Sequence, residues 1–300
     1  MKTKIKAAVT VILLWVITGV FPGYARAAGS PGFTIPVPNA PGAAAQNNKK
    51  AVIDYSNTKD GYVMAKYEQS TKKSVKVIVK GPSGVSYTYS IRPGNYEVFP
   101  LSDGNGGYTV GVYEQIEGTK YAVANTATMK VSLSSEFAPF LCPNQYVNYN
   151  KDSQTVHKAA ELSGSTAGIT DNISAIYNFI ISNFSYDKAL ASKVQSGYLP
   201  NVDEVLSKRT GICFDYAAVM TAMLRSLGIP CKLVVGYAGE VYHAWVNVYS
   251  KETGKVNQVI SFDGRSWTHM DPTFASSANQ SAEIMKYIGN GSNYKAKFMY

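Results

Sequence analysis

The sequence predicts an α+β protein in which a β-rich N-terminal module precedes a helix that packs on an antiparallel sheet. Residues 51–133 show the two-residue alternation of short strands, and residues 213–227 carry an apolar stripe with a period near 3.6. Two further strand patterns, 232–238 and 241–249, follow that helix and are joined by a short turn. Strands and helices that are grouped in separate blocks are typical of this fold class.

Residues 1–27 have the three parts of a secretory signal peptide: a basic start (MKTKIK), an apolar run, and an Ala25-Arg26-Ala27 cleavage pattern. The apolar run is short for a membrane span, and no later stretch is apolar enough to cross a bilayer. We therefore expect a secreted, extracellular protein, with cell-wall association or a retained N-terminal anchor as alternatives. Residues 28–50, rich in Pro, Gly, Ala and Asn, are expected to form a flexible linker.

Residues 51–133 predict a small β-sandwich. YVMAKYE (62–68), SVKVIVK (74–80), VSYTYSI (85–91) and YTVGVYE (108–114) alternate, and turn signals separate them. No catalytic constellation occurs here, so a spacer or binding module is expected. Residues 134–300 are then the catalytic domain. It begins with a connector over 134–160. A helical stretch over 170–195, capped by Thr170 or Asp171, and a short helix over 200–211, ending at Gly211, are expected to follow.

Composition excludes two classes of protein. Hydrophobic residues make up 45% of the 300 residues and charged residues 16%, which is typical of a chain with a sizeable core and excludes a disordered one. The net charge of +9 includes four basic residues in 1–27, so 9 − 4 leaves +5 in the mature chain. Since Lys and Arg do not cluster with aromatic residues, nucleic acid is not an expected partner.

Cys142, Cys213 and Cys231 are the three cysteines. An odd number in an exported protein leaves one thiol free or paired between chains, and a Cys142–Cys231 disulfide stays open. Cys213 begins the predicted helix, where the dipole and unpaired N–H groups can lower a thiol pKa from its ordinary ~8.5 and can bind an oxyanion. The alternative is a small apolar residue that starts a core helix.

His243 and Asp271 complete a candidate constellation. His243 alternates with Trp245 on the strand 241–249, opposite the more apolar face, and is expected to point toward the Cys213 helix. Asp271 ends a strand in WTHMDPTF (267–274), where its carboxylate can accept the imidazole N–H, or can simply cap a turn before Pro272. Together the three residues supply a nucleophile, a base and an orienting group.

GICFDYAAVMTAMLRSLGIPCKLVVGY, YHAWVNVY and WTHMDPTF together resemble the transglutaminase-like superfamily over roughly residues 155–275. The resemblance implies a papain-like core within the α+β fold and a catalytic triad of Cys213, His243 and Asp271. It further implies that Tyr186 supports the oxyanion, and we expect Trp245 to wall the site. Secreted bacterial members look most similar. Because the family's calcium-binding insertions are not recognisable, we expect no metal and no cofactor.

Other candidates fit structural roles. Asp263 in Phe-Asp-Gly looks like a turn residue after a third strand over 256–264. His269 shares a strand with Asp271, His157 lies outside the motif, and Asp215 is expected to support the helix start. A zinc site would need close pairs such as C-x-x-C, which the sequence lacks.

The triad predicts an enzyme that acts on amide bonds through an acyl-thioester. Hydrolysis, as in a protease or amidase, is slightly favoured over acyl transfer to an amine. Transglutaminase-type crosslinking and a non-catalytic cell-wall or protein-binding module are the alternatives. Protein, peptide or cell-wall peptide is the expected substrate, and the sequence predicts neither the oligomeric state nor the ligand of the β module.

Overall fold

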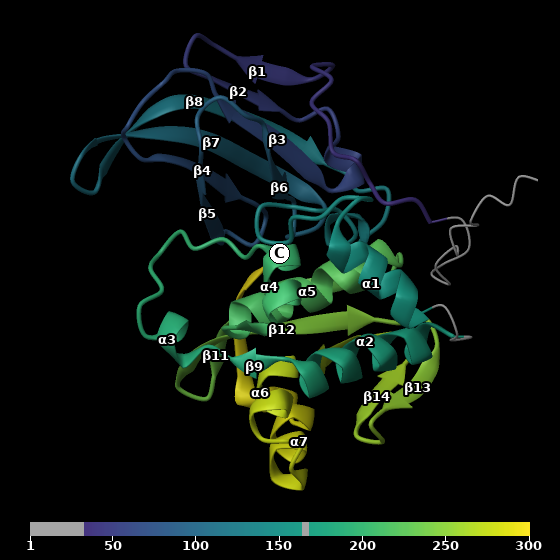
Figure 1. Cartoon of the computed structure of the whole chain (residues 1–300). Coiled ribbons are helices and arrows are strands. Elements are labelled where there is room, and N and C mark those ends of the chain that lie inside the picture. Colours follow the sequence, from purple (N-terminus) through teal and green to yellow (C-terminus); the bar gives the residue numbers. More distant parts are fainter. Residues whose placement is uncertain (1–32, 164–167) are drawn as a thin grey trace, which may run out of the picture.

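The computed structural model describes residues 33–163 and 168–300 of the chain (Figure 1). The predicted signal peptide, residues 1–27, lies outside the described residues. A β-rich region forms the top of the molecule in Figure 1, and helices packed on a second group of strands form the rest. The predicted α+β class, with an N-terminal β-rich region and a helix on an antiparallel sheet, is confirmed.

The N-terminal region consists of strands and two 3-10 turns. Its elements are β1 (Ala45–Asn47), β2 (Ala51–Asp54), η1 (Thr58–Asp60), β3 (Tyr62–Tyr67), β4 (Val75–Lys80), β5 (Ser86–Ile91), β6 (Glu97–Pro100), β7 (Gly106–Glu117), β8 (Lys120–Val131) and η2 (Ala138–Phe140). They form one antiparallel sheet in the order β1-β2-β3-β6 and another in the order β5-β4-β7-β8. Strands β5 and β6 therefore lie at sheet edges.

Alternation explains why these segments are strands. In β5, Tyr87, Tyr89 and Ile91 are buried, and the residues between them are exposed. The inward side chains of the two sheets belong to one apolar core. The expected linker over 28–50 differs in part, because Ala45–Asn47 pairs with β2 as an antiparallel strand. The side-chain amide of Asn125 on β8 donates to the carbonyls of Gln46 and Ala51, which ties this segment down.

The C-terminal region contains both helices and strands. Its helices are α1 (Gln154–Ser163), α2 (Ile169–Asn183), α3 (Lys188–Ala191), α4 (Val202–Lys208), α5 (Cys213–Ser226), α6 (Pro272–Ser277), α7 (Ala282–Gly289) and the 3-10 turn η3 (Gly291–Asn293). Its strands are β9 (Ser185–Tyr186), β10 (Thr210–Gly211), β11 (Cys231–Ala238), β12 (Val241–Tyr249), β13 (Thr253–Val256), β14 (Ile260–Asp263), β15 (Trp267–Met270) and β16 (Tyr294–Met299).

Two helix ends differ from the prediction. Helix α2 is capped at Gly168 and not at Thr170 or Asp171, because the carboxylate of Glu252 accepts from the backbone N–H groups of Ile169 and Thr170. Helix α4 ends at Lys208 and not at Gly211. Arg209 takes the left-handed conformation there (φ 53°) and ends the helix, which frees Thr210–Gly211 to pair with β9.

The central antiparallel sheet of this region has the order β15-β12-β11-β16. The predicted strands 232–238 and 241–249 are present as β11 and β12, and the predicted helix 213–227 is α5. The third strand expected over 256–264 is present only at Ile260–Asp263, because Val256 ends the preceding strand and the two strands form a separate hairpin, β13 with β14. The C-terminal strand β16 pairs with the other side of β11 and occupies the edge of the sheet.

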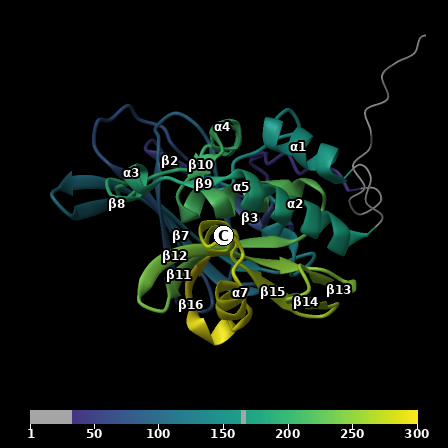
Figure 2. The same cartoon turned by 60° about the horizontal axis from the view of Figure 1, so that its bottom comes forward.

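Helix α5 packs against β11 and β12, α6 contacts both α5 and α2, and α7 packs against α6 and β15 (Figures 1 and 2). The Sγ of Cys231 lies 3.5 Å from the Thr221 hydroxyl of α5, and Cys231 is paired with Val248. By alternation, the α5 face therefore carries Ala244, Val246 and Val248, all in the core. His243 points to the other face, so the expectation that the Cys213 helix covers this face is wrong, but the first residue of α5 still contacts the imidazole.

The two regions meet through aromatic side chains. Tyr300 packs edge-on against Tyr87 and Tyr89 of β5, with ring centroids 5.7 and 5.9 Å apart, and against Tyr146 at 4.6 Å. All four rings are packed in one core that extends through both regions. Within the described residues, no helix has the length and apolarity needed to cross a membrane.

Candidate active site

Cys213 is the first residue of α5, where backbone N–H groups lack partners within the helix. Asp215, fully buried, stabilises this start: its carboxylate accepts from the backbone N–H of Ile212 at 2.9 Å and from the Tyr198 hydroxyl at 2.7 Å. Burial raises the pKa of Asp215, against the opposing effect of these two hydrogen bonds. This is the supporting position that the sequence predicted for Asp215.

His243 and Asp271 are in direct contact. The Nε2 of His243 lies 2.8 Å from Asp271 Oδ2, and both side chains are buried. The strand pairing explains the meeting: β15 runs antiparallel to β12 and pairs Met270 with Val246, which brings residue 271 alongside the first half of β12. Phe274 of α6 stacks on the imidazole with ring centroids 4.3 Å apart and so fixes the plane of the ring.

Asp271 combines the two roles that the sequence left as alternatives. Its Oδ1 accepts from the backbone N–H groups of Thr273 and Phe274 and caps α6 in front of Pro272. Its Oδ2 accepts from His243 and from the hydroxyl of Tyr294 at 2.9 Å. A carboxylate held by four donors has little freedom to rotate, so it fixes the position of the imidazole.

Cys213, in the first turn of α5, is the second hydrogen-bonding partner of the His243 imidazole, besides Asp271. Burial lowers the pKa of His243, but hydrogen bonds with Asp271 and with the Cys213 thiol outweigh it and raise the pKa to about 9. Since Asp271 occupies Nε2, the ring has Nδ1 left for the thiol. The predicted residues Cys213, His243 and Asp271 therefore lie together, with the imidazole between sulfur and carboxylate.

A cavity of about 320 Å³ opens over Cys213 and His243. Its walls are largely aromatic and aliphatic, and the rings that line it are Tyr146, Tyr186, Tyr198, Phe214, Tyr242 and Tyr300. Tyr242 is 56% exposed and Tyr186 is 37% exposed, so they form an open apolar rim. Cys213 is half-buried at the base of this opening, where a substrate carbonyl can reach it.

Tyr186 and Trp245 were both expected beside the triad, but only Tyr186 lines the cavity. Tyr186 lines the cavity with Cys213, and its strand β9 pairs with β10 directly before α5. Burial, followed by the nearby Cys213, raises the pKa of the Tyr186 phenol, which keeps its proton. Trp245, in contrast, is not among the residues that line this cavity. It is buried behind His243, with its ring 5.1 Å from that of Tyr294.

Sequence reasoning missed Tyr294, on β16. Burial and the Asp271 carboxylate raise the pKa of its phenol, so the hydroxyl stays protonated and donates to Asp271. The chain contains 22 tyrosines and no local motif marks this one. Only the pairing of β16 with β11 brings the tail back to the site.

The remaining candidates are placed elsewhere or play other parts. His269 packs on Tyr294 at 3.9 Å, and burial lowers its pKa to about 4, so the ring is neutral near pH 7. Asp263 accepts from the backbone of Arg265 and Ser266 in a turn, and these bonds lower its pKa to about 2. His157 is exposed on α1. Within residues 33–163 and 168–300, no cluster of three His, Cys, Asp or Glu side chains is arranged to hold a metal.

Cys142 and Cys231 are free, buried thiols, so the disulfide left open by the sequence is not formed. Burial raises the pKa of each to about 11. Their backbone carbonyls have a structural use instead. The buried guanidinium of Arg225 donates to the carbonyls of Cys231 (2.9 Å), Cys142 (2.6 Å) and Tyr300 (2.6 Å). Arg225 therefore joins α5 to the connector, β11 and the C-terminus.

Comparisons with known proteins point to one superfamily. Residues 156–272 match the family model described as the transglutaminase-like superfamily. A protein-glutamine gamma-glutamyltransferase from Pseudomonas aeruginosa is 30% identical over 86 residues, which cover 24% of this chain and 11% of that protein. The chain thus spans only a small part of the length of that curated relative.

Solved structures with partial similarity include a Cytophaga hutchinsonii protein described as a cysteine protease candidate (17% identity, TM-score 0.35, 78% of this chain and 76% of that one). Red sea bream transglutaminase is another (12% identity, TM-score 0.34, 73% and 49%). The matched segment begins in α1, encloses Cys213 and His243 and ends just after Asp271, and residues 156–272 of this chain therefore form a domain of the transglutaminase-like superfamily.

Proposed function

We propose that this protein is a secreted cysteine enzyme that cleaves amide bonds through an acyl-thioester intermediate. The contact of His243 with Asp271 on one side and Cys213 on the other supports the proposal most directly. A nucleophile, a base and an orienting carboxylate in this order suit acyl transfer from an amide carbonyl. The apolar cavity above Cys213 offers room for the side chain next to that carbonyl.

In the proposed reaction, the Cys213 proton moves to Nδ1 of His243 and the thiolate attacks the carbonyl carbon. Asp271 stabilises the imidazolium from Nε2. Backbone N–H groups at the start of α5, with the Tyr186 hydroxyl, would bind the developing oxyanion. The tetrahedral species collapses as His243 protonates the leaving amine, and water then hydrolyses the thioester.

Transfer of the acyl group to an amine, which would crosslink proteins, is the second candidate. The curated relative named as a gamma-glutamyltransferase favours it. Both reactions share the first half and differ only in whether water or an amine reaches the thioester. Secretion is part of the proposal because of the signal-like residues 1–27. N-terminal sequencing of exported protein should give a chain that starts after Ala27.

Thiol alkylation tests the proposal. Cys213 should react with iodoacetamide near pH 7 at least about tenfold faster than Cys142 or Cys231, because the latter are buried and protonated. His243→Ala should slow the reaction, and His157→Ala, on exposed α1, should leave it at the wild-type rate. Equal reactivity of the three thiols would favour a non-catalytic binding module.

Peptide libraries incubated with and without a primary amine then separate the two reactions. Mass spectrometry should show cleaved or deamidated peptides if water is the acceptor, and amine adducts if transfer dominates. Cys213→Ala should abolish both kinds of product. Product formation that survives this substitution would contradict the assigned nucleophile.

A further inference from the structure

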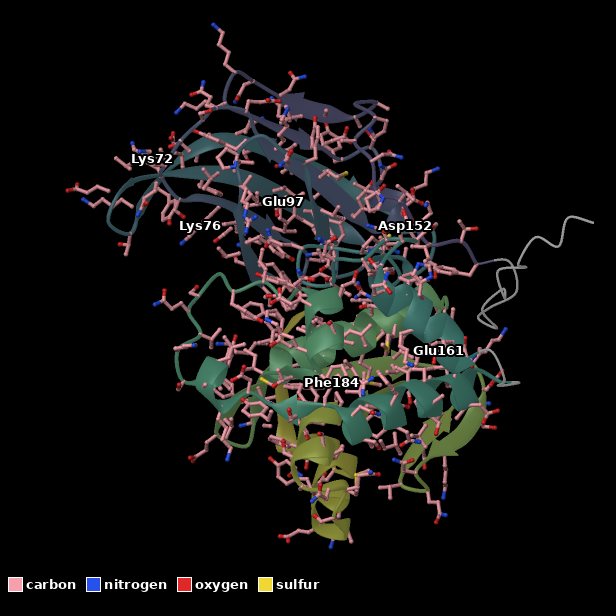
Figure 3. All side chains as sticks on the ribbon, viewed as in Figure 1. Lys72, Lys76, Glu97, Asp152, Glu161 and Phe184 are labelled. Carbon is pink, nitrogen blue, oxygen red and sulfur yellow. The ribbon has the colours of Figure 1, made fainter. Side chains whose placement is uncertain are left out.

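A second, larger cavity lies next to the first, where the β-rich region meets the helices. Its volume is about 730 Å³, and we call it the junction groove. It is lined by Pro38 and residues 90–92 and 95–98 of the β-rich region, by residues 143–145 and 148–150 of the connector, and by Gly197 and residues 199–201. Glu97, labelled in Figure 3, marks the β-rich side.

The junction groove adjoins the Cys213 cavity. Gly197 lines both cavities, and Tyr146 of the connector faces the Cys213 cavity while its neighbours Asn144 and Gln145 line the groove. A chain that leaves the Cys213 cavity past Gly197 therefore enters the groove.

Two amide side chains in the groove have unused hydrogen-bonding atoms. Asn144 is only 4% exposed; its Oδ1 accepts from the N–H groups of Tyr146 and Val147, and its Nδ2 has no partner. Gln145 shows the opposite arrangement, since its Nε2 donates to Ser90 and Glu97 and its Oε1 has no partner. An unsatisfied buried polar atom destabilises the site, so a ligand that supplies both an acceptor and a donor would be stabilised here.

The neighbouring strands favour a polypeptide as that ligand. Ser90 and Ile91 belong to β5, and Glu97 and Val98 belong to β6, and both strands are edges of their sheets. Edge strands present backbone groups that pair with an extended chain; on β5 the Ser90 carbonyl already accepts from Gln145, so β6 is the better edge for pairing. The charged groups of the lining, Arg92 and Glu97, are of opposite sign, so the groove has no preference for a charged ligand.

We infer that the junction groove binds an extended, uncharged polypeptide segment of the substrate whose acyl group Cys213 attacks. The inference rests on the proposed function for the identity of the reacting residue, but the groove itself is defined independently of catalysis. A peptide unit carries a carbonyl and an N–H, which would pair with Asn144 Nδ2 and Gln145 Oε1 when these side chains turn toward the groove.

The test compares peptides of about four residues with peptides of about twelve, which extend over roughly 40 Å. Asn148, an exposed groove residue, is replaced by Trp to block the groove without removing a buried contact. The ratio of kcat/KM for long over short peptides should fall about tenfold, through KM. Asn47→Trp, on the outer edge strand β1, is the matched control and should keep the wild-type ratio.

Asn144→Asp is a second variant, because it keeps the Oδ1 acceptor and replaces the unpaired amide donor with a charged carboxylate oxygen, which can only accept. It should lower the same ratio, with thermal unfolding as the check on folding. An unchanged ratio in Asn148→Trp would overturn the inference even if the enzyme turns over.

A peptide-binding measurement tests this inference independently of the proposed function. Cys213→Ala should bind a fluorescein-labelled twelve-residue peptide, and adding Asn148→Trp should weaken binding about tenfold. Peptide binding without any turnover by the wild-type protein would contradict only the proposed function. Binding of chitin oligosaccharides in place of peptide would overturn the groove's assignment to polypeptide.

Discussion

At the scale of single residues, the site depends on one carboxylate that serves two elements. Asp271 caps α6 through Oδ1 and positions His243 through Oδ2. The sequence could predict Cys213, His243 and Asp271, since helix start, strand interior and Asp-Pro are local patterns. It could not predict Tyr294, because a tyrosine in the tail carries no local sign of the partner that strand pairing gives it.

Tyr294→Phe should slow alkylation of Cys213 and peptide turnover by about tenfold. The substitution removes one donor from a buried carboxylate, and a hydrogen bond to a charged group contributes ~1.5–3 kcal/mol. With one donor fewer, Asp271 attracts the imidazolium proton more strongly, so the basic limb of the pH–rate profile should move to higher pH. The neighbouring Tyr287→Phe should keep the wild-type profile. A Tyr294→Phe profile identical to wild type would assign Tyr294 to packing alone.

At the scale of elements, periodicity predicted α5, β11 and β12 well because apolar residues recur at the period of each element and most of them are buried. The hairpin of β13 and β14 was missed. Its turn has positive φ at Asn257 (48°) and Gln258 (61°), and that pair lacks the glycine that usually signals such a turn. The start of α1, at Gln154, was also not predicted, because residues 134–160 were expected to form a connector. Helix α1 packs against α5, and this tertiary contact leaves no local sign in the sequence.

Arg225→Lys tests how α5 is joined to its neighbours. A lysine keeps the charge but cannot reach three carbonyls in a planar fork, so buried acceptors lose their partner. We expect the free energy of unfolding in urea to fall by ~2–4 kcal/mol. Arg265→Lys, in an exposed turn, should change it by less than about 0.5 kcal/mol. If Arg225→Lys lowers the free energy of unfolding by less than about 1 kcal/mol, the three hydrogen bonds of Arg225 do not stabilise the fold as expected.

At the scale of the whole molecule, two histidines give opposite pH dependences in separate windows. The folded-state pKa of His243, about 9, exceeds the ordinary 6.5, so its stabilisation is fully present below pH 6.5 and is lost as pH rises toward 9. The pKa of His269, about 4, lies below 6.5, so the folded state loses stability as pH falls from 6.5 toward 4. These two residues therefore favour maximal stability near pH 6.5.

Urea midpoints measured from pH 4 to pH 10 would check this expectation. His243→Gln should flatten the dependence above pH 6.5, and His269→Gln should flatten it below. His157→Gln, on the exposed face of α1, serves as the control and should follow the wild-type curve. If His243→Gln and His269→Gln both show the wild-type dependence of the urea midpoint on pH, the pKa shifts assigned to these two histidines are wrong.

The shared aromatic contact of Tyr87, Tyr89, Tyr146 and Tyr300 has a consequence for engineering. A catalytic fragment that begins at residue 134 would lack Tyr87 and Tyr89. The rings of Tyr146 and Tyr300, which are packed against them in the full chain, would then become part of a solvent-exposed apolar surface. The fragment should aggregate in solution, whereas the full chain should unfold in a single cooperative transition on heating.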